Sequence, residues 1–162
     1  MCLLILLNSD LFGKILCFSQ PNLQTFFTHT FFMDVALQHF IYNRTNLAHI
    51  LQDQQELGAH TDIIEIQPKK ISTFRWSHPG ARPMGFEIYN QCSTCARLKP
   101  FKPTVNSSKT QVSLECTSCK KITVYKFPTG WNWVNGAPTK SDTRGAWMVQ
   151  VNSQEEDLMD IA

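Results

Sequence analysis

Two short cysteine motifs, Cys92-Ser93-Thr94-Cys95 and Cys116-Thr117-Ser118-Cys119, decide how the middle of this chain folds. Each motif places two thiolates on one tight turn, and residues 96–115 between them are enough for the chain to return and bring the second turn opposite the first. Four sulfur atoms can then surround one ion tetrahedrally, which is the coordination that structural Zn²⁺ prefers. We therefore predict that these four cysteines bind one structural Zn²⁺.

The chain has six cysteines, and the other two, Cys2 and Cys17, stand alone in apolar surroundings. We expect these two to be buried or incidental thiols. Because six is an even number, a secreted protein held by disulfides is the alternative to a metal site. The paired CxxC spacing favours the metal, since a disulfide within CxxC closes a tight loop that is typical of redox sites.

The residues around the two motifs alternate between strand signals and turn signals. Stretches that favour extended backbone occur at 86–89, 99–103, 111–114 and 122–127. A turn is predicted at residues 106–109, where Asn, Ser and Lys follow one another. The order is strand, cysteine turn, strand, turn, strand, cysteine turn, strand. This order predicts two hairpins held together by one ion.

In this layout residues 86–127, about a quarter of the chain, resemble the zinc-ribbon class. The resemblance implies metal binding but no particular function, because zinc ribbons occur in transcription factors, ribosomal proteins, topoisomerases and transposon-derived proteins. Ribbons often carry glycine after the second cysteine of each turn, where positive φ is favoured. This chain has Ala96 and Lys120 there. We expect the two turns to be strained or shifted in register.

Upstream of the ribbon, apolar residues recur at helical spacing over residues 33–57, with Thr30 as a candidate N-cap and Gly58 as a C-terminal stop. His39 and His49 lie in this pattern, and we interpret them as packed or exposed helix residues. Strands are predicted at 62–67 and 70–76.

The predicted fold is therefore α+β: an N-terminal helical segment plus a small antiparallel sheet with a four-cysteine zinc ribbon. We divide the chain into an apolar N-terminal helical segment (1–61), a β-rich zinc-ribbon domain (62–150) and an acidic tail (151–162). Residues 1–32 are rich in Phe but show no clean periodicity.

The net charge of +2 hides an uneven distribution along the chain. Residues 1–68 carry −4, residues 69–150 carry +10, and residues 151–162 carry −4. A basic segment of this kind is typical of contact with a polyanion, so nucleic acid is the leading predicted partner. The predicted contact residues are Arg97, Lys99, Lys102, Lys109, Lys120, Lys121 and Lys126.

Aromatic residues interleave with these cations, at Phe101, Tyr125 and Phe127. A basic hairpin can follow phosphates while an aromatic ring stacks on a base, without reading the base sequence. The alternative is that the cations serve the metal site alone. Four thiolates around Zn²⁺ carry a formal charge of −2, which neighbouring lysines can offset.

Two further hypotheses remain open. The chain can be a protein-interaction module that uses the Trp131-Asn132-Trp133 loop or the Phe-rich N-terminal segment, or a fragment of a larger protein, for example one derived from a mobile element. The tryptophans have a simpler interpretation, in which their rings cover the end of the small ribbon core.

We predict no enzymatic activity, because four cysteines fill the coordination shell of the metal and no catalytic motif is present. The apolar run Cys2–Leu7 is too short for a signal peptide and lacks a preceding basic residue. The stretch 15–33 carries too many polar groups for a membrane helix. We therefore expect an intracellular protein, nuclear or cytoplasmic, with no membrane contact.

Overall fold

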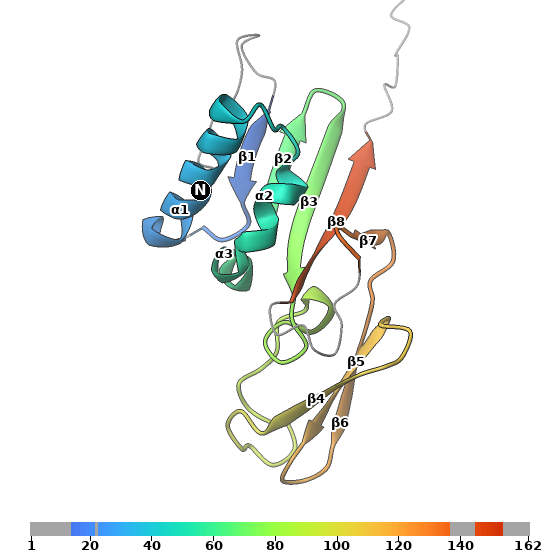
Figure 1. Ribbon diagram of the computed structural model, residues 1–162. Helices are drawn as coiled ribbons and strands as arrows, with labels where there is room; N and C mark the ends of the chain where they lie inside the picture. Colours follow the sequence, from blue (N-terminus) through green and yellow to red (C-terminus); the bar gives the residue numbers. More distant parts are fainter. Residues whose placement is uncertain (1–13, 22, 137–144, 154–162) are drawn as a thin grey trace, which may run out of the picture.

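The computed structural model describes residues 14–21, 23–136 and 145–153, which form two antiparallel sheets (Figure 1). The larger sheet has, in spatial order, the strands β1 (Ile15–Phe18), β2 (Ile63–Gln67), β3 (Lys70–Ser77), β8 (Ala146–Ser153) and β7 (Trp131–Trp133). The smaller sheet has the strands β4 (Phe101–Val105), β5 (Gln111–Cys116) and β6 (Ile122–Lys126). With the helices on one face of the larger sheet, this architecture confirms the predicted α+β class.

The helical part is less regular than the sequence predicts. Its elements are α1 (Thr25–Ala36), the π-helical turn η1 (Leu37–Ile41), α2 (Leu47–Ile50), the 3₁₀ turn η2 (Leu51–Asp53) and α3 (Gln55–His60). The single helix predicted over 33–57 is wrong in its bounds. The helix begins at Thr25 and stops before Asn43, whose φ of 52° lies in the left-handed region that often ends helices. Asn46 then caps α2 by accepting a hydrogen bond from the Ala48 N–H.

Both predicted helix boundaries are also wrong. Thr30 lies inside α1, whose N-cap is Gln24, and Gly58 lies inside α3. Close packing requires a glycine at position 58. A Cβ atom there would lie 2.5 Å from the Trp76 Cβ and 2.7 Å from the Trp147 Cζ2, so the glycine lets α3 approach the sheet closely.

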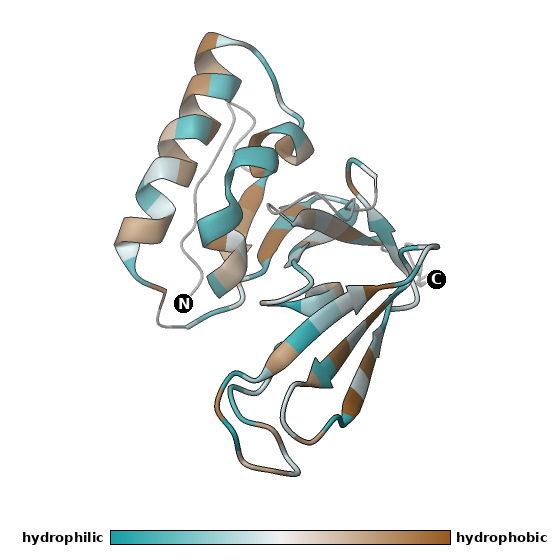
Figure 2. Cartoon of the chain, turned by 60° about the horizontal axis from the view of Figure 1, so that its bottom comes forward, coloured by the Kyte–Doolittle hydropathy of each residue, from teal (hydrophilic) through white to brown (hydrophobic). Residues whose placement is uncertain are grey.

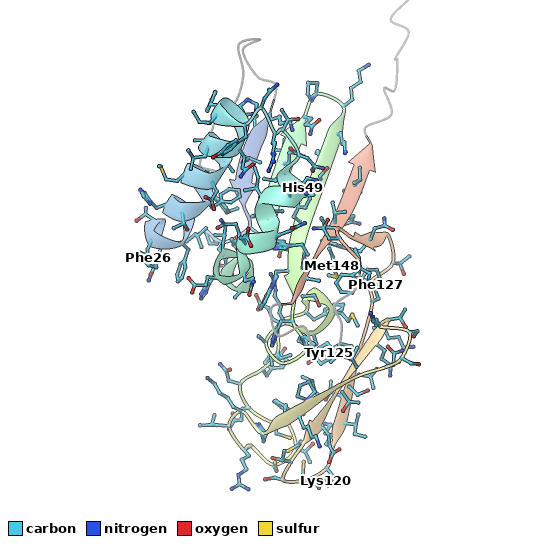
Figure 3. The ribbon with its side chains drawn as sticks, in the orientation of Figure 1. Phe26, His49, Lys120, Tyr125, Phe127 and Met148 are labelled. Atoms are coloured by element: carbon cyan, nitrogen blue, oxygen red, sulfur yellow. The ribbon has the colours of Figure 1, made fainter. Side chains whose placement is uncertain are left out.

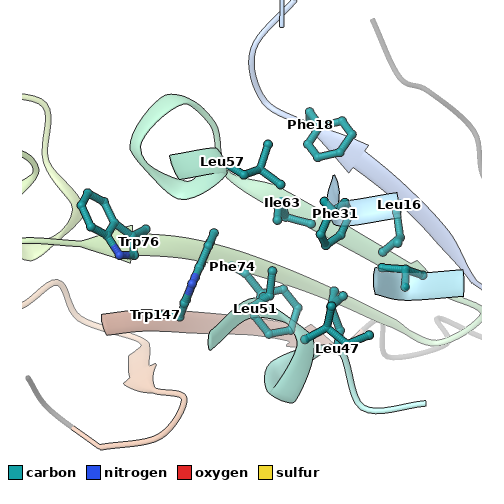
Figure 4. Close-up of a cluster of buried hydrophobic side chains, with 12 residues drawn as sticks. Leu16, Phe18, Phe31, Leu47, Leu51, Leu57, Ile63, Phe74, Trp76 and Trp147 are labelled. Atoms are coloured by element: carbon teal, nitrogen blue, oxygen red, sulfur yellow. The ribbon is translucent and has the colours of Figure 1, made fainter. Parts of the chain in front are cut away.

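The main hydrophobic core lies between these helices and the larger sheet (Figure 4). Phe18, Ile63 and Phe74 face each other across three neighbouring strands, and Trp76 pairs with Trp147 in the next. From the helical layer, Phe31 and Leu51 are completely buried against them. The predicted strands at 62–67 and 70–76 are thus confirmed as β2 and β3.

The smaller sheet has one buried face and one exposed face. Val112 and Leu114 are buried, with Phe101, Val105 and Tyr125 around them. The predicted strands at 99–103, 111–114 and 122–127 correspond to β4, β5 and β6.

The predicted strand at 86–89 is not formed, so the ribbon has three strands where four were expected. Its alternating pattern has another cause. Ile88 packs against the ribbon core and Tyr89 points to solvent, although neither residue belongs to a strand.

A connecting segment, residues 78–86, joins the two sheets and includes the turn η3 (Pro83–Gly85). Met84 is buried in the ribbon core. Arg82 reaches the other way: its guanidinium binds Asp62 Oδ1 at 2.7 Å and the Gly58 carbonyl at 3.0 Å. Arg75 binds the other oxygen of the same buried carboxylate at 2.7 and 2.8 Å. Asp62 therefore fixes the connecting segment to the larger sheet.

The ribbon is inserted between two strands that pair with each other, because β3 precedes it in sequence, β8 follows it, and the two are neighbours. The larger sheet also includes β1, which comes from the segment 1–61, and pairs it with β2. The division of the chain at residues 61 and 150 stays a prediction. Among the described residues, no helix is long and apolar enough to cross a membrane.

Candidate metal centre

The four cysteines of the two motifs meet at the end of the ribbon. Their Sγ atoms all lie within 4.8 Å of one another. Between the two motifs, the Sγ atoms of Cys92 and Cys119 lie 3.7 Å apart and those of Cys95 and Cys116 lie 3.6 Å apart. Sulfur atoms at the vertices of a tetrahedron with Zn–S bonds of about 2.3 Å are about 3.8 Å apart. The cluster therefore has the dimensions of a site for one metal ion such as Zn²⁺, and its sulfur atoms are too far apart for disulfides.

Each motif forms a turn with the same hydrogen bonds. In the first, the Ala96 N–H donates to the Cys92 carbonyl at 2.9 Å, and the Cys92 N–H donates to the Arg97 carbonyl at 2.9 Å. In the second, the equivalent bonds of Cys116 with Lys120 and Lys121 measure 2.9 and 2.8 Å. The turns keep their register. Ala96 and Lys120 adopt φ of 54° and 63°, so the expected strain is present at both positions that commonly hold glycine.

Two cations cross between the turns. The Arg97 guanidinium donates to the Ser118 hydroxyl at 2.6 Å, and the Lys121 ammonium donates to the Ser93 hydroxyl at 3.1 Å. Arg97 and Lys121 occupy equivalent positions, each two residues after the second cysteine of its motif. The contacts are therefore reciprocal, and they place two positive charges beside the thiol cluster.

The protein environment divides the thiols by their pKa. Hydrogen bonds from the backbone N–H groups of Cys95 and Thr94 lower the pKa of Cys92 to about 6. The pKa of Cys116 is likewise lowered, chiefly by the Cys119 N–H. At Cys119 the Lys121 N–H lowers the pKa, but burial and the three neighbouring thiols together outweigh it and raise the pKa to about 11. A bound cation is what allows all four thiols to ionise together.

Cys92 and Cys116 are buried, Cys119 is partly buried and Cys95 is exposed, so one side of the cluster reaches the surface. Within the described residues, this is the only group of three or more His, Cys, Asp or Glu side chains placed to hold a metal ion, and His39 and His49 are not part of it. Cys17 is buried, as predicted. Cys2 lies outside the described residues.

The seven predicted contact cations separate into two groups. Lys109 and Lys126 lie at the end of the ribbon that carries the 106–110 turn. The other five lie at the end that carries the cysteines, which we call the basic tip: Arg97, Lys99, Lys102, Lys120 and Lys121. Figure 3 shows Lys120 at the end of the ribbon remote from the larger sheet.

All five side chains of the basic tip belong to exposed residues. Within the described strands β4, β5 and β6 their one acidic neighbour is Glu115, which pairs with Lys120 at 3.2 Å and lies opposite Lys102 in the sheet.

Most of the aromatic residues singled out from the sequence serve packing. Phe127 lies against Trp133 with 4.8 Å between ring centroids, and Trp133 belongs to β7 and not to a loop. The Arg75 guanidinium lies 4.7 Å from the centroid of the Trp131 ring. The interpretation in which tryptophan covers the ribbon core thus fits Trp133.

Sequence reasoning missed Tyr89, which is 84% exposed beside the ribbon. The signal was present, since the alternation of residues 86–89 places Tyr89 on the same side as charged Glu87.

Comparison of the chain with known protein families, with characterised proteins and with solved structures gives no significant match. The likeness to the zinc-ribbon class therefore rests on the two CxxC pairs and the small antiparallel sheet around them.

Proposed function

We propose that this chain is a zinc-stabilised binding module that contacts nucleic acid through its basic tip. The observation that carries the proposal is the convergence of five exposed cations on the cysteine end of the ribbon, with Glu115 as their one acidic neighbour in the ribbon strands. The metal would be a single structural Zn²⁺ held by Cys92, Cys95, Cys116 and Cys119, because four thiolates complete its shell and leave no open position for chemistry.

The charge balance of the tip supports a role beyond holding the metal. Zn²⁺ with four thiolates carries a formal charge of −2, and Glu115 adds one negative charge. The five cations exceed this total. Arg97 and Lys121 contact serines of the opposite turn, and Lys120 pairs with Glu115. Among the described residues, Lys99 and Lys102 have no side-chain partner and are the cations most available to an external anion. Phosphate groups are the polyanion that such a surface binds without sequence specificity.

The experiment is a salt titration of nucleic-acid binding by fluorescence anisotropy with the zinc-loaded full chain. The affinity should fall steeply with salt, and the double variant Lys99→Ala/Lys102→Ala should reduce the log–log slope by about 1.4–1.8, the contribution of two phosphate contacts. Lys109→Ala/Lys126→Ala removes the same charge from the other end of the ribbon and should change the slope less. If no nucleic acid binds at low salt, the proposal is wrong.

A second candidate function, contact with protein, is favoured by an apolar stripe along α1 and η1. The stripe consists of residues with exposed fractions between 43% and 74%: Phe26, Met33, Leu37, Phe40, Ile41 and Tyr42. In Figure 2, hydrophobic colours recur along the whole length of α1. A large side chain can bury about 150–250 Å², so the stripe offers on the order of 600 Å², close to the ~800 Å² per partner of a standard interface.

The occupant that fits this stripe is a second copy of the chain. Between Thr25 and Asn43 the only charged residue is Asp34, and Arg44, whose guanidinium lies 5.9 Å from the centroid of the Tyr42 ring, adds a cation at the end of the stripe. So few charges let two stripes meet without strong repulsion and offer little attraction to an anionic surface. Sedimentation velocity should show a dimer that Phe40→Glu converts to a monomer. Leu98→Glu, at a residue that is 72% exposed on the ribbon, is the matched control. A monomeric wild-type chain would exclude self-association through this stripe.

A further inference from the structure

Two hollows adjoin residues 88–93: the larger is also lined by residues of β4, β5 and β6, and the smaller by Gly80, Ala81, Lys99 and Phe101. Their volumes are about 450 Å³ and about 320 Å³, and both are within the range of clefts that hold organic ligands. Ile88, Tyr89 and Phe101 line both hollows, so the two adjoin at these residues, and we call the pair the Tyr89 groove. Among the described residues that line the two hollows, none has an acidic side chain. We infer that the Tyr89 groove binds single-stranded nucleic acid, an inference that rests on the proposed function.

Tyr89 supplies the stacking surface. Its side chain is 84% exposed although it borders both hollows, so most of the ring is available to a planar ligand. The floor beneath it is fixed, because Ile88 and Phe101 pack against the buried ribbon core. A nucleobase that lies on an aromatic ring over an apolar floor gains stacking energy whatever its identity.

Each hollow also has one cation. Lys121 lines the larger hollow together with Ser93, and the 3.1 Å contact between their side chains holds the ammonium at its border. Lys99 lines the smaller hollow together with Asn90, and its N–H donates to the Asn90 carbonyl at 2.7 Å. Aromatic stacking between two cations is the arrangement that binds a base together with the phosphates on either side of it.

This arrangement favours single strands over duplexes. In a duplex the faces of the bases stack on one another and only their edges reach the grooves, so no base can lie on Tyr89 without being unpaired. A single strand exposes its base faces at no such cost. Because Cys92 lines the larger hollow, the metal centre forms part of its wall and should be kept loaded in any test.

The test compares a twelve-nucleotide oligothymidylate with a duplex of equal length, both labelled and titrated with the zinc-loaded full chain. The single strand should bind more tightly. Tyr89→Ala should weaken single-strand binding roughly 5- to 100-fold, the value of one stacked base, and leave duplex binding unchanged. Tyr89→Phe keeps the ring and should retain the wild-type affinity. Leu98→Ala is the control, because Leu98 is 72% exposed on the same ribbon but lines neither hollow.

The outcomes separate the inference from the proposed function. If the wild-type chain binds both strands equally and Tyr89→Ala does not change either affinity, the Tyr89 groove is not the binding site and the basic tip acts alone. If Leu98→Ala loses as much affinity as Tyr89→Ala, the groove is likewise excluded. If neither strand binds at 50 mM salt, the proposed function is wrong and the inference is wrong with it.

Discussion

Replacement of Asp62 by Asn tests how the ribbon is fixed to the larger sheet. The Asp62 side chain is 7% exposed and accepts three charge-assisted hydrogen bonds of 2.7 to 2.8 Å, two from Arg75 and one from Arg82. Asn keeps the shape but removes the charge, so two guanidinium groups that are 28% and 11% exposed lose their counter-ion. Removing one partner of a buried ion pair costs about 3–5 kcal/mol.

The matched control is Glu115→Gln, which breaks the ion pair between Glu115 and Lys120. These side chains are 41% and 70% exposed, and a surface pair contributes about 0–1 kcal/mol. Urea unfolding with saturating zinc should give a free energy of unfolding reduced by about 3–5 kcal/mol for Asp62→Asn and by less than about 1 kcal/mol for Glu115→Gln. For a chain of this size the first loss lowers Tm by roughly 10 °C. Equal effects of the two substitutions would show that Asp62 does not hold the sheets together.

Zinc affinity should rise with pH between about 6 and 8, because the Cys119 thiol, with its pKa raised to about 11, must lose a proton when the metal binds. Cys92, with a pKa of about 6, is already largely a thiolate at pH 7. Chelator competition at several pH values measures the zinc affinity, and an affinity that does not change with pH would contradict this prediction. Ala96→Gly should stabilise the zinc-loaded chain by about 0.5–1 kcal/mol, because it relieves the left-handed backbone of the first cysteine turn; an unchanged urea midpoint would argue against strain there. Gly85→Ala should cost about 1–3 kcal/mol, because the new Cβ meets the Arg75 side chain at a φ of 77°; wild-type stability would mean that the connecting segment can move away from the sheet.

The cluster of four cysteines was predictable because its determinants are local. The CxxC spacing fixes each turn by itself, and alternation in residues 111–116 sets which side of β5 is buried, with Val112 and Leu114 inside. The strain at Ala96 and Lys120 could also be expected, because the cysteine turn requires a positive φ at these positions and glycine adopts it more easily than Ala or Lys.

The parts that were missed depend on contacts between distant residues. β1 is short and buried, so its sequence shows no alternation that would predict a strand, and the strand is defined by its pairing with β2. Thr30 has the chemistry of an N-cap, but Phe27 and Phe31 around it pack against the sheet core, and this packing extends α1 past it. The grouping of five cations at one end of the ribbon depends on the register of the strands, and the register cannot be inferred from amino-acid composition.

The position of the ribbon between β3 and β8 also has a kinetic consequence. The two strands can pair only after a loop of about 70 residues closes. Such long-range pairing slows folding, because the chain loses the conformational entropy of the loop before the contacts between the strands form. A metal ion that joins residues 92 and 119 early would shorten the flexible part of that loop and lower its closure cost by roughly 0.5 kcal/mol. The cysteine centre would then act at a distance, because refolding with zinc present would bring the last long strand of the larger sheet into place sooner.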